Sequence, residues 1–201
     1  MGSKIVISLL IIVLLAGLAY GALGIYRLQS VPAVHNPAQP DNTGFEWEEL
    51  YGHYYATIGD HIYFASFGGY MYRVNLQNLS RELYLQMPVF GIATDEESLF
   101  FAVANDGDTV LVSYSPQTGY MQAITNILGA NANIRYHNGM IFFVDNAGQI
   151  RSILPCGRPV ATHSPTNVAT FEVRLPLLIF TERNCYLQKE YNMNTGEINF
   201  P

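Results

Sequence analysis

The sequence predicts an all-β domain, built from about four repeats of four antiparallel strands, behind one N-terminal transmembrane α-helix. Three observations support this fold class. An uncharged apolar run lies near the N-terminus, and an apolar triplet recurs at regular intervals after it. The chain also has 14 Tyr and 11 Phe but only 13% charged residues. Such a composition suits half-buried strands and argues against intrinsic disorder.

The first element is the run Ile5–Tyr26, which contains 22 residues and no charge. As a helix it would be about 33 Å long, enough for a hydrocarbon core of about 30 Å. The alternative is a cleaved signal peptide, in which Met1–Lys4 is the positively charged start and Gly17-Leu18-Ala19 the cleavage site. Because the apolar run is longer than that of a usual signal peptide, we expect a retained signal anchor, residues 5–26.

The flanking charges predict the orientation of this single span. Lys4 precedes the helix and Arg27 follows it. A four-residue head is most simply kept in the cytoplasm, which places the long C-terminal domain outside it. Gly17 and Gly21 form a small-xxx-small pattern that lets two membrane helices approach closely, although glycine is common in such helices. We therefore expect a helix–helix contact there and a homo- or hetero-oligomer.

Residues 27–43 are a Pro-rich spacer, and residues 44–201 form the β domain. All 16 acidic residues but only eight of the ten basic residues lie beyond Arg27, so the chain after Arg27 has a formal charge of −8. The phosphates of a nucleic acid would be repelled by this charge. Nucleic acid is therefore excluded as a partner.

Four segments of the domain share one pattern: an apolar triplet, a turn, a second apolar strand and another turn. Their spacings of 37, 42 and 37 residues lie in the range of β-propeller blades. The repeats cover approximately residues 51–86, 87–127, 128–165 and 166–201. The triplets are Ile62-Tyr63-Phe64, Leu99-Phe100-Phe101, Ile141-Phe142-Phe143 and Leu178-Ile179-Phe180.

A strand before and a strand after each triplet, with a weaker fourth strand, make the antiparallel meander of a propeller blade. The first strands would line the central channel, and they contain only Arg135 and Glu172 as charged residues. They are Tyr54–Ile58, Val89–Thr94, Asn133–Tyr136 and Thr170–Val173. The third strands are Tyr70–Val74, Thr109–Tyr114, Gln149–Leu154 and Tyr186–Tyr191.

One repeat resembles a known type of blade. Ile141–Asp145 followed by Gly148–Ser152 is similar to the YWTD-type repeat of low-density-lipoprotein-receptor-like propellers. Leu178–Glu182 and Ile62–Ser66 resemble it more loosely. No repeat keeps the Trp, and that family normally closes six blades. The resemblance implies binding of a protein partner and carries over no site residues.

Four repeats leave the ends of the array to be covered. Gly44–Leu50, with Phe45 and Trp47, is predicted either to join the last blade as an outer strand or to leave the ends to a partner subunit. The first and last repeats are as aromatic as the middle ones, so neither is expected to act as a polar cap.

The only two cysteines, Cys156 and Cys185, fall in turns at opposite ends of the predicted strands. Bridged cysteines need Cα atoms within about 7 Å. We therefore expect two free thiols, with a Cys156–Cys185 disulfide as the alternative for a domain outside the cytoplasm. Asn78 begins a glycosylation sequon in a predicted turn.

The remaining polar motifs predict no chemistry. Asn105–Asp108 lacks the oxygen ligands of a calcium loop and is typical of a hairpin turn. The acidic runs at 46–49 and 95–97 are expected to be solvated. No phosphate loop or nucleophile elbow is present, and the five histidines show no metal spacing. The histidines are His35, His53, His61, His137 and His163.

We therefore expect no catalytic, metal or cofactor residue and no cofactor. The predicted function is a membrane-anchored extracytoplasmic module for protein binding or assembly, as an accessory subunit of a larger membrane complex. The alternative is a membrane-tethered hydrolase with its site in the propeller channel. An enzyme would bring more polar groups together in that channel than Arg135 and Glu172.

Overall fold

The computed structural model describes residues 54–66, 69–105, 108–126, 128–129, 133–163, 166–183 and 185–200. The chain divides into two compact units, Met1–Pro32 and Ala33–Pro201, and every described residue belongs to the second unit. The predicted transmembrane run, the spacer and Gly44–Leu50 lie outside the described residues. In the described part of the chain, no helix has the length and apolar character needed to span a membrane.

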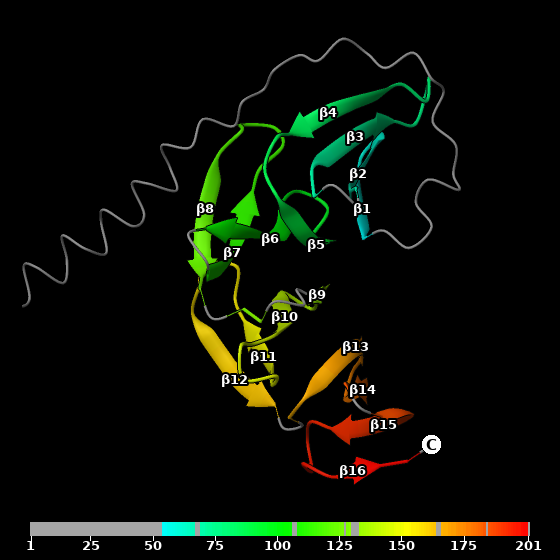
Figure 1. Ribbon diagram of the computed structural model, residues 1–201, viewed down its shortest axis with the longest axis vertical. Helices are drawn as coiled ribbons and strands as arrows, with labels where there is room; N and C mark the ends of the chain where they lie inside the picture. The colour runs from blue at the N-terminus through cyan, green and yellow to red at the C-terminus, as the bar shows by residue number, and fades with distance from the viewer. Residues whose placement is uncertain are drawn as a thin grey trace, which may run out of the picture. The chain divides into compact units, whose positions relative to one another are not determined.

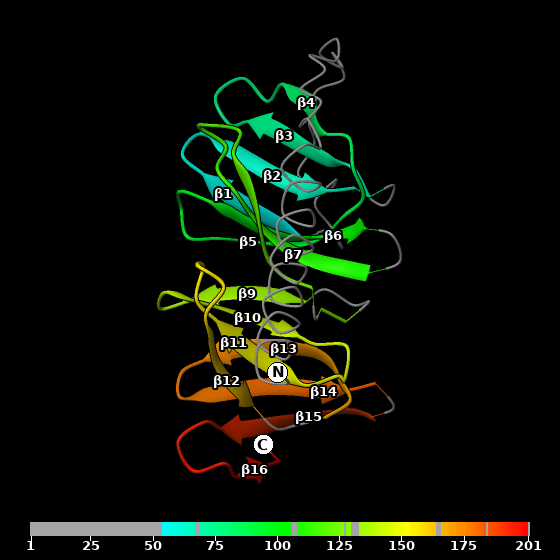
Figure 2. The ribbon, with the colours of Figure 1, turned by 90° about the vertical axis from the view of Figure 1, so that its left-hand side faces the viewer.

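The described residues form four sheets of four antiparallel strands, each in the order in which its strands follow along the chain (Figures 1 and 2). The prediction of an all-β array of four-stranded antiparallel sheets is confirmed. Sheet 1 consists of β1 (Tyr55–Ile58), β2 (His61–Ala65), β3 (Met71–Asn75) and β4 (Arg81–Leu85). Sheet 2 consists of β5 (Val89–Thr94), β6 (Leu99–Asn105), β7 (Asp108–Tyr114) and β8 (Met121–Thr125). Sheet 3 consists of β9 (Ile134–His137), β10 (Met140–Val144), β11 (Ile150–Ile153) and β12 (Pro159–His163). Sheet 4 consists of β13 (Val168–Arg174), β14 (Leu177–Glu182), β15 (Cys185–Asn192) and β16 (Ile198–Asn199).

The apolar triplets form the second strand of each sheet, and both faces of these strands are covered. In β6, Leu99, Phe100 and Phe101 all have 0% exposure. Strand side chains alternate between the two faces, so a strand buried on both sides has a continuous apolar run. Phe100 packs with Phe143 between sheets 2 and 3. The sheets therefore pack face to face along the chain.

Within a triplet, neighbouring residues face different sheets. In β10, Ile141 and Phe143 pack with Phe100 of the preceding sheet 2. The middle residue, Phe142, packs instead with Leu178 and Phe180 of the following sheet 4. The first and third residues of a triplet thus face the preceding sheet, and the middle residue faces the next one.

Backbone hydrogen bonds to two glycine carbonyls join neighbouring sheets. The N–H of Val89, which begins β5, donates to the carbonyl of Gly69 at 2.6 Å. The N–H of Val168, which begins β13, donates to the carbonyl of Gly148 at 3.0 Å. Gly69 and Gly148 have φ of 82° and 75°, which glycine adopts without strain. Each glycine lies in the turn after a triplet strand, and its hydrogen bond joins that turn to the first strand of the next sheet.

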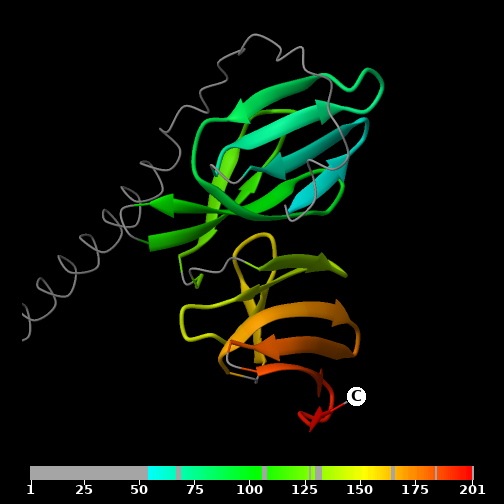
Figure 3. The same cartoon turned by 45° about the vertical axis from the view of Figure 1, so that its right-hand side comes forward.

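The last sheet has four strands from its own repeat, because β16 pairs with β15 at the C-terminus (Figure 3). The outer face of this sheet differs from the sequence-based expectation that the last repeat is not a polar cap. The aromatic and aliphatic residues Phe171, Leu178 and Phe180 all pack toward sheet 3. The register places mainly polar residues on the opposite face, so the last repeat does present a polar outer face. These residues are Thr170, Glu172, Arg174, Thr181, Gln188 and Glu190, accompanied by Leu177 and Ile179.

Candidate functional site

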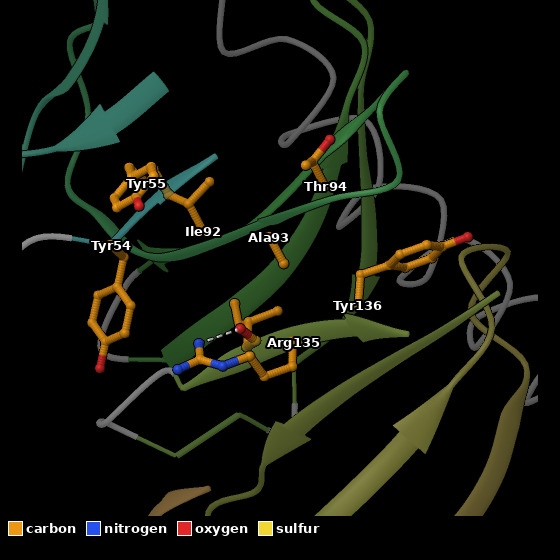
Figure 4. A pocket seen from close by; sticks show the side chains of 8 residues that line it. Tyr54, Tyr55, Ile92, Ala93, Thr94, Arg135 and Tyr136 are labelled. Carbon is orange, nitrogen blue, oxygen red and sulfur yellow. Dashed lines mark hydrogen bonds between the residues drawn. The ribbon is translucent and has the colours of Figure 1, made fainter. Parts of the chain in front are cut away.

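A pocket of about 370 Å³ opens along the first strands of three sheets (Figure 4). It is within the volume range of small-ligand and peptide-side-chain sites, roughly 300–1,000 Å³. Three of the four strands expected to line a central channel contribute to it. The lining residues are Tyr54, Tyr55, Ile92, Ala93, Thr94, Ile134, Arg135 and Tyr136. We call this space the tyrosine–arginine pocket.

The face of β9 on which the Arg135 side chain lies is set by its two neighbours on that strand, which are fixed in the core. Ile134 has 0% exposure, and the ring of Tyr136 stacks on Phe100 with a centroid distance of 5.5 Å. Alternation along the strand then sends Arg135 to the other face. Its Nη1 donates to the carbonyl of Ile134 at 2.9 Å, and its Cζ lies 5.9 Å from the ring centre of Tyr54 (Figure 4).

The tyrosines supply contact area around this cation. Tyr54 is 41% exposed and Tyr55 is 55% exposed. Exposed tyrosines combine an apolar ring with a polar hydroxyl and lose little side-chain entropy on binding, which is why they are common in interfaces. The pocket therefore offers rings for packing and one guanidinium for a charge.

One carboxylate whose pKa the charge of Arg135 affects, that of Glu172, is already paired elsewhere. Glu172 of β13 accepts hydrogen bonds from Nε and Nη2 of Arg174 at 2.9 and 3.0 Å. These hydrogen bonds lower the pKa of Glu172, and the charge of Arg135 lowers it further. No carboxylate, imidazole or thiol accompanies Arg135 among the lining residues of the tyrosine–arginine pocket. Through Arg135, the pocket thus carries a positive charge in a domain whose net charge is negative.

A second groove, of about 270 Å³, lies along β11 and β12. Its one cation is Arg151, whose Nε donates to Oδ2 of Asp145 at 2.5 Å. Asp145 is 1% exposed, and its Oδ1 accepts the N–H groups of Ala147 and Gln149, each at 2.9 Å. Arg151 is therefore neutralised by a structural carboxylate and is less suited to a charged ligand.

The two cysteines lie at opposite ends of their strands. Cys156 is exposed in the turn between β11 and β12, and Cys185 is half-buried at the start of β15. Both are free thiols. Asn78 lies exposed in the turn between β3 and β4, where its Oδ1 accepts the N–H of Ser80 at 2.9 Å.

The proposed turn at 105–108 joins β6 and β7. Asn105 and Asp108 face each other at the end of this hairpin, while Asp106 and Gly107 lie outside the described residues. Asp95 accepts the N–H of Ser98 at 2.7 Å, which gives this part of the acidic run a role in the turn. Within the described ranges, no group of three or more His, Cys, Asp or Glu residues could hold a metal ion.

His163 is half-buried, stacked on Phe142 at 5.8 Å and hydrogen-bonded to Ser152 at 3.0 Å. It points from β12 toward the apolar interface with sheet 4. This burial was not predicted from the sequence. The alternation of His163 with the exposed Thr162 was the available signal. His61 and His137 lie next to turns, at the start of β2 and the end of β9. Gly17, Gly21, His35 and His53 lie outside the described residues.

Comparison with known proteins identifies the class of fold. No family model and no curated protein matches the sequence. TolB from Acinetobacter baumannii is similar with a TM-score of 0.56 and 17% identity, over 70% of this chain and 40% of that one. A chain of the nidogen/laminin complex has a TM-score of 0.56 and 12% identity, over 71% and 60%. Dihydro-heme d1 dehydrogenase NirN has a TM-score of 0.52 and 14% identity, over 74% and 35%.

The chain thus spans less than two thirds of the length of each of these solved chains. Its four antiparallel meander sheets and these likenesses define a β-propeller fold. Identities this low show the fold alone, and they do not distinguish the YWTD type of blade from others. Function has to be argued from the site.

Proposed function

We propose that this chain is a membrane-tethered β-propeller module that binds another protein through the tyrosine–arginine pocket. The observation that carries the proposal is that the guanidinium of Arg135, on the first strand of sheet 3, lies beside the exposed ring of Tyr54 in the pocket. Arginine and tyrosine are the residue types that contribute most to binding energy at protein interfaces.

The charge of the pocket suggests what the partner presents. Arg135 is a cation in a chain whose part beyond Arg27 has a formal charge of −8. A carboxylate on the partner would accept hydrogen bonds from the guanidinium, and its apolar neighbours would pack on Tyr54 and Tyr55. The partner segment is therefore proposed to carry an acidic side chain or a C-terminal carboxylate beside an apolar residue.

The rival function, a tethered hydrolase, requires an acid and a base or a nucleophile that converge on one point. Arg135 is accompanied in the pocket by tyrosines, Thr94 and aliphatic residues. Glu172 is held by Arg174 on the outer face of sheet 4. Binding is therefore the function that this arrangement supports better.

The binding site is tested by charge reversal with a matched control. Arg135→Glu should abolish recovery of the partner when the detergent-solubilised full-length chain is used for affinity isolation and quantitative mass spectrometry. Arg158→Glu makes the same change at an exposed residue in the turn between β11 and β12 and should preserve recovery. If every protein recovered with the wild type is also recovered with Arg135→Glu, the pocket is not the site.

Membrane attachment is a separate part of the proposal. It is supported by the apolar run Ile5–Tyr26 and by the charges of Lys4 and Arg27 on either side. The domain is proposed to lie outside the cytoplasm, as an accessory subunit of a membrane complex in which Gly17 and Gly21 contact another helix. Protease added to intact cells should digest the β domain and leave a small anchored fragment. Full protection of the domain would contradict this orientation.

A further inference from the structure

The face of sheet 1 that points away from sheet 2 carries a cluster of buried apolar residues. The register places Ile62, Phe64 and Val74 on this face, opposite to Tyr63, whose ring meets Tyr84 on the sheet-2 side. Ile62 and Phe64 are each 3% exposed, and Val74 is 0% exposed. The described apolar residues that pack against these three come from the same repeat, Tyr72 and Leu76. We call this surface the outer face of sheet 1.

In sheets 3 and 4, the equivalent residues contact the preceding sheet. Ile141 and Phe143 pack on sheet 2, and Leu178 and Phe180 pack on sheet 3. Ile62 and Phe64 hold the same positions of the triplet, so sheet 1 presents a complete interface where no described sheet precedes it. Some other element has to cover this face, because exposed apolar surface of this kind is costly in water.

Sheet 4 does not match this face chemically. The outer face of sheet 4 carries the Glu172–Arg174 ion pair, whose side chains are 53% and 63% exposed. Packing Phe64 and Ile62 against that pair would remove both charges from water. The array therefore ends in a polar cap on the C-terminal side and in an apolar interface on the N-terminal side.

We propose that Gly44–Leu50 covers the outer face of sheet 1, with Phe45 and Trp47 packed on Ile62, Phe64 and Val74. The segment precedes β1 by a few residues, so it is within reach. Phe45 and Trp47 alternate with Glu46 and Glu48, as in a strand with one apolar side. Extended, its seven residues span about 23 Å, enough to cross the strands of one sheet.

Charge and burial also favour this occupant. Arg81 pairs with Val74 across β3 and β4 and lies on the same face, with its Cζ 5.6 Å from the ring centre of Tyr72. The segment has three glutamates, at 46, 48 and 49, to meet this cation. The low exposure of Ile62, Phe64 and Val74 fits a face that is covered in the folded protein.

Trp47 is the only tryptophan and reports on the segment directly. In a full-length Cys156→Ser/Cys185→Ser background, a nitroxide is attached at Thr57→Cys or at Thr170→Cys. Both threonines are exposed, the first on the outer face of sheet 1 and the second on that of sheet 4. The label at position 57 should quench Trp47 fluorescence several-fold more than the label at position 170.

Each other outcome overturns the proposal. Stronger quenching from position 170 would mean that the segment closes on the last sheet, and no quenching from either position would mean that it lies on neither sheet. Labelled Thr57→Cys that also carries Trp47→Phe is then mixed with unlabelled wild type. Quenching in this mixture would show that the segment of a second copy, rather than of the same chain, covers the face.

Discussion

Ser152 of β11 and His163 of β12 are joined by a 3.0 Å hydrogen bond between Oγ and Nε2. Phe142 stacks on the imidazole at 5.8 Å, and Tyr191 of sheet 4 meets it edge-on at 6.4 Å. Burial lowers the pKa of His163 below its ordinary value. This burial favours the neutral form of the imidazole over the imidazolium.

The histidine makes stability depend on pH. Because its pKa is lowered in the folded state, the unfolded chain binds the proton more tightly below about pH 6.5. The contribution of His163 to stability is thus present above that pH and is lost as the pH falls through the folded pKa. The urea midpoint should fall between about pH 7.5 and pH 5.5, and His163→Gln should flatten this dependence. His137→Gln is the control, and an equal flattening in it would contradict the assignment.

Tyr84 should make stability depend on pH at the alkaline end. Burial raises its pKa, and the hydrogen bond from Tyr114 at 3.2 Å accompanies this shift. The protonated phenol is favoured in the folded state, so its contribution is present below about pH 10 and is lost as the pH rises above it. Tyr84→Phe should lessen this alkaline loss of stability, whereas Tyr120→Phe, at a 53% exposed ring, should not. Thermal unfolding at several alkaline pH values measures the difference.

Asp145→Ala should destabilise sheet 3 strongly. It removes one buried carboxylate that accepts two backbone N–H groups and pairs with Arg151. We expect a loss of about 2–3 kcal/mol in the free energy of unfolding. Asp60→Ala removes an exposed carboxylate that accepts one hydrogen bond from Gln77, and it should cost less than about 1 kcal/mol. Similar losses in the two variants, measured by urea denaturation, would contradict the structural role of Asp145.

The strands were predictable from the sequence for a physical reason. A strand covered on both faces needs consecutive apolar residues, and Leu99-Phe100-Phe101 shows this directly. The aromatic content of the last repeat does not reveal the polar outer face of sheet 4, because a residue count does not distinguish the two faces of a strand. The period-two pattern of Thr170, Glu172 and Arg174 was the signal for it.

The pocket was predictable only in part. Its location on the first strands follows from the repeat, which also predicts that Arg135 lies there. The pairing of Glu172 with Arg174 depends on two side chains meeting on one face of β13. The burial of His163 depends on sheet 4, which comes later in the chain. Such contacts between sheets leave little trace in one sequence.

The thiols should differ in accessibility. Cys156 is exposed and Cys185 is half-buried, so Cys156 should be alkylated faster in the native protein. After denaturation without reductant, mass spectrometry should find two alkylated thiols per chain. Cys156→Ser should leave one slow thiol. A quantitative intramolecular disulfide would mean that the two turns approach each other, contrary to their positions at opposite strand ends.

The central claim is that the tyrosine–arginine pocket receives a protein partner. Two tyrosines of nearly equal exposure allow a direct measurement: Tyr55 is 55% exposed at the pocket, and Tyr120 is 53% exposed before β8 and away from it. A photo-crosslinking residue placed at either position in the full-length chain in its membrane reports what lies beside it. We predict a discrete crosslinked protein from position 55 and none from position 120. No crosslinked protein from position 55, or the same protein from both positions, would contradict the account.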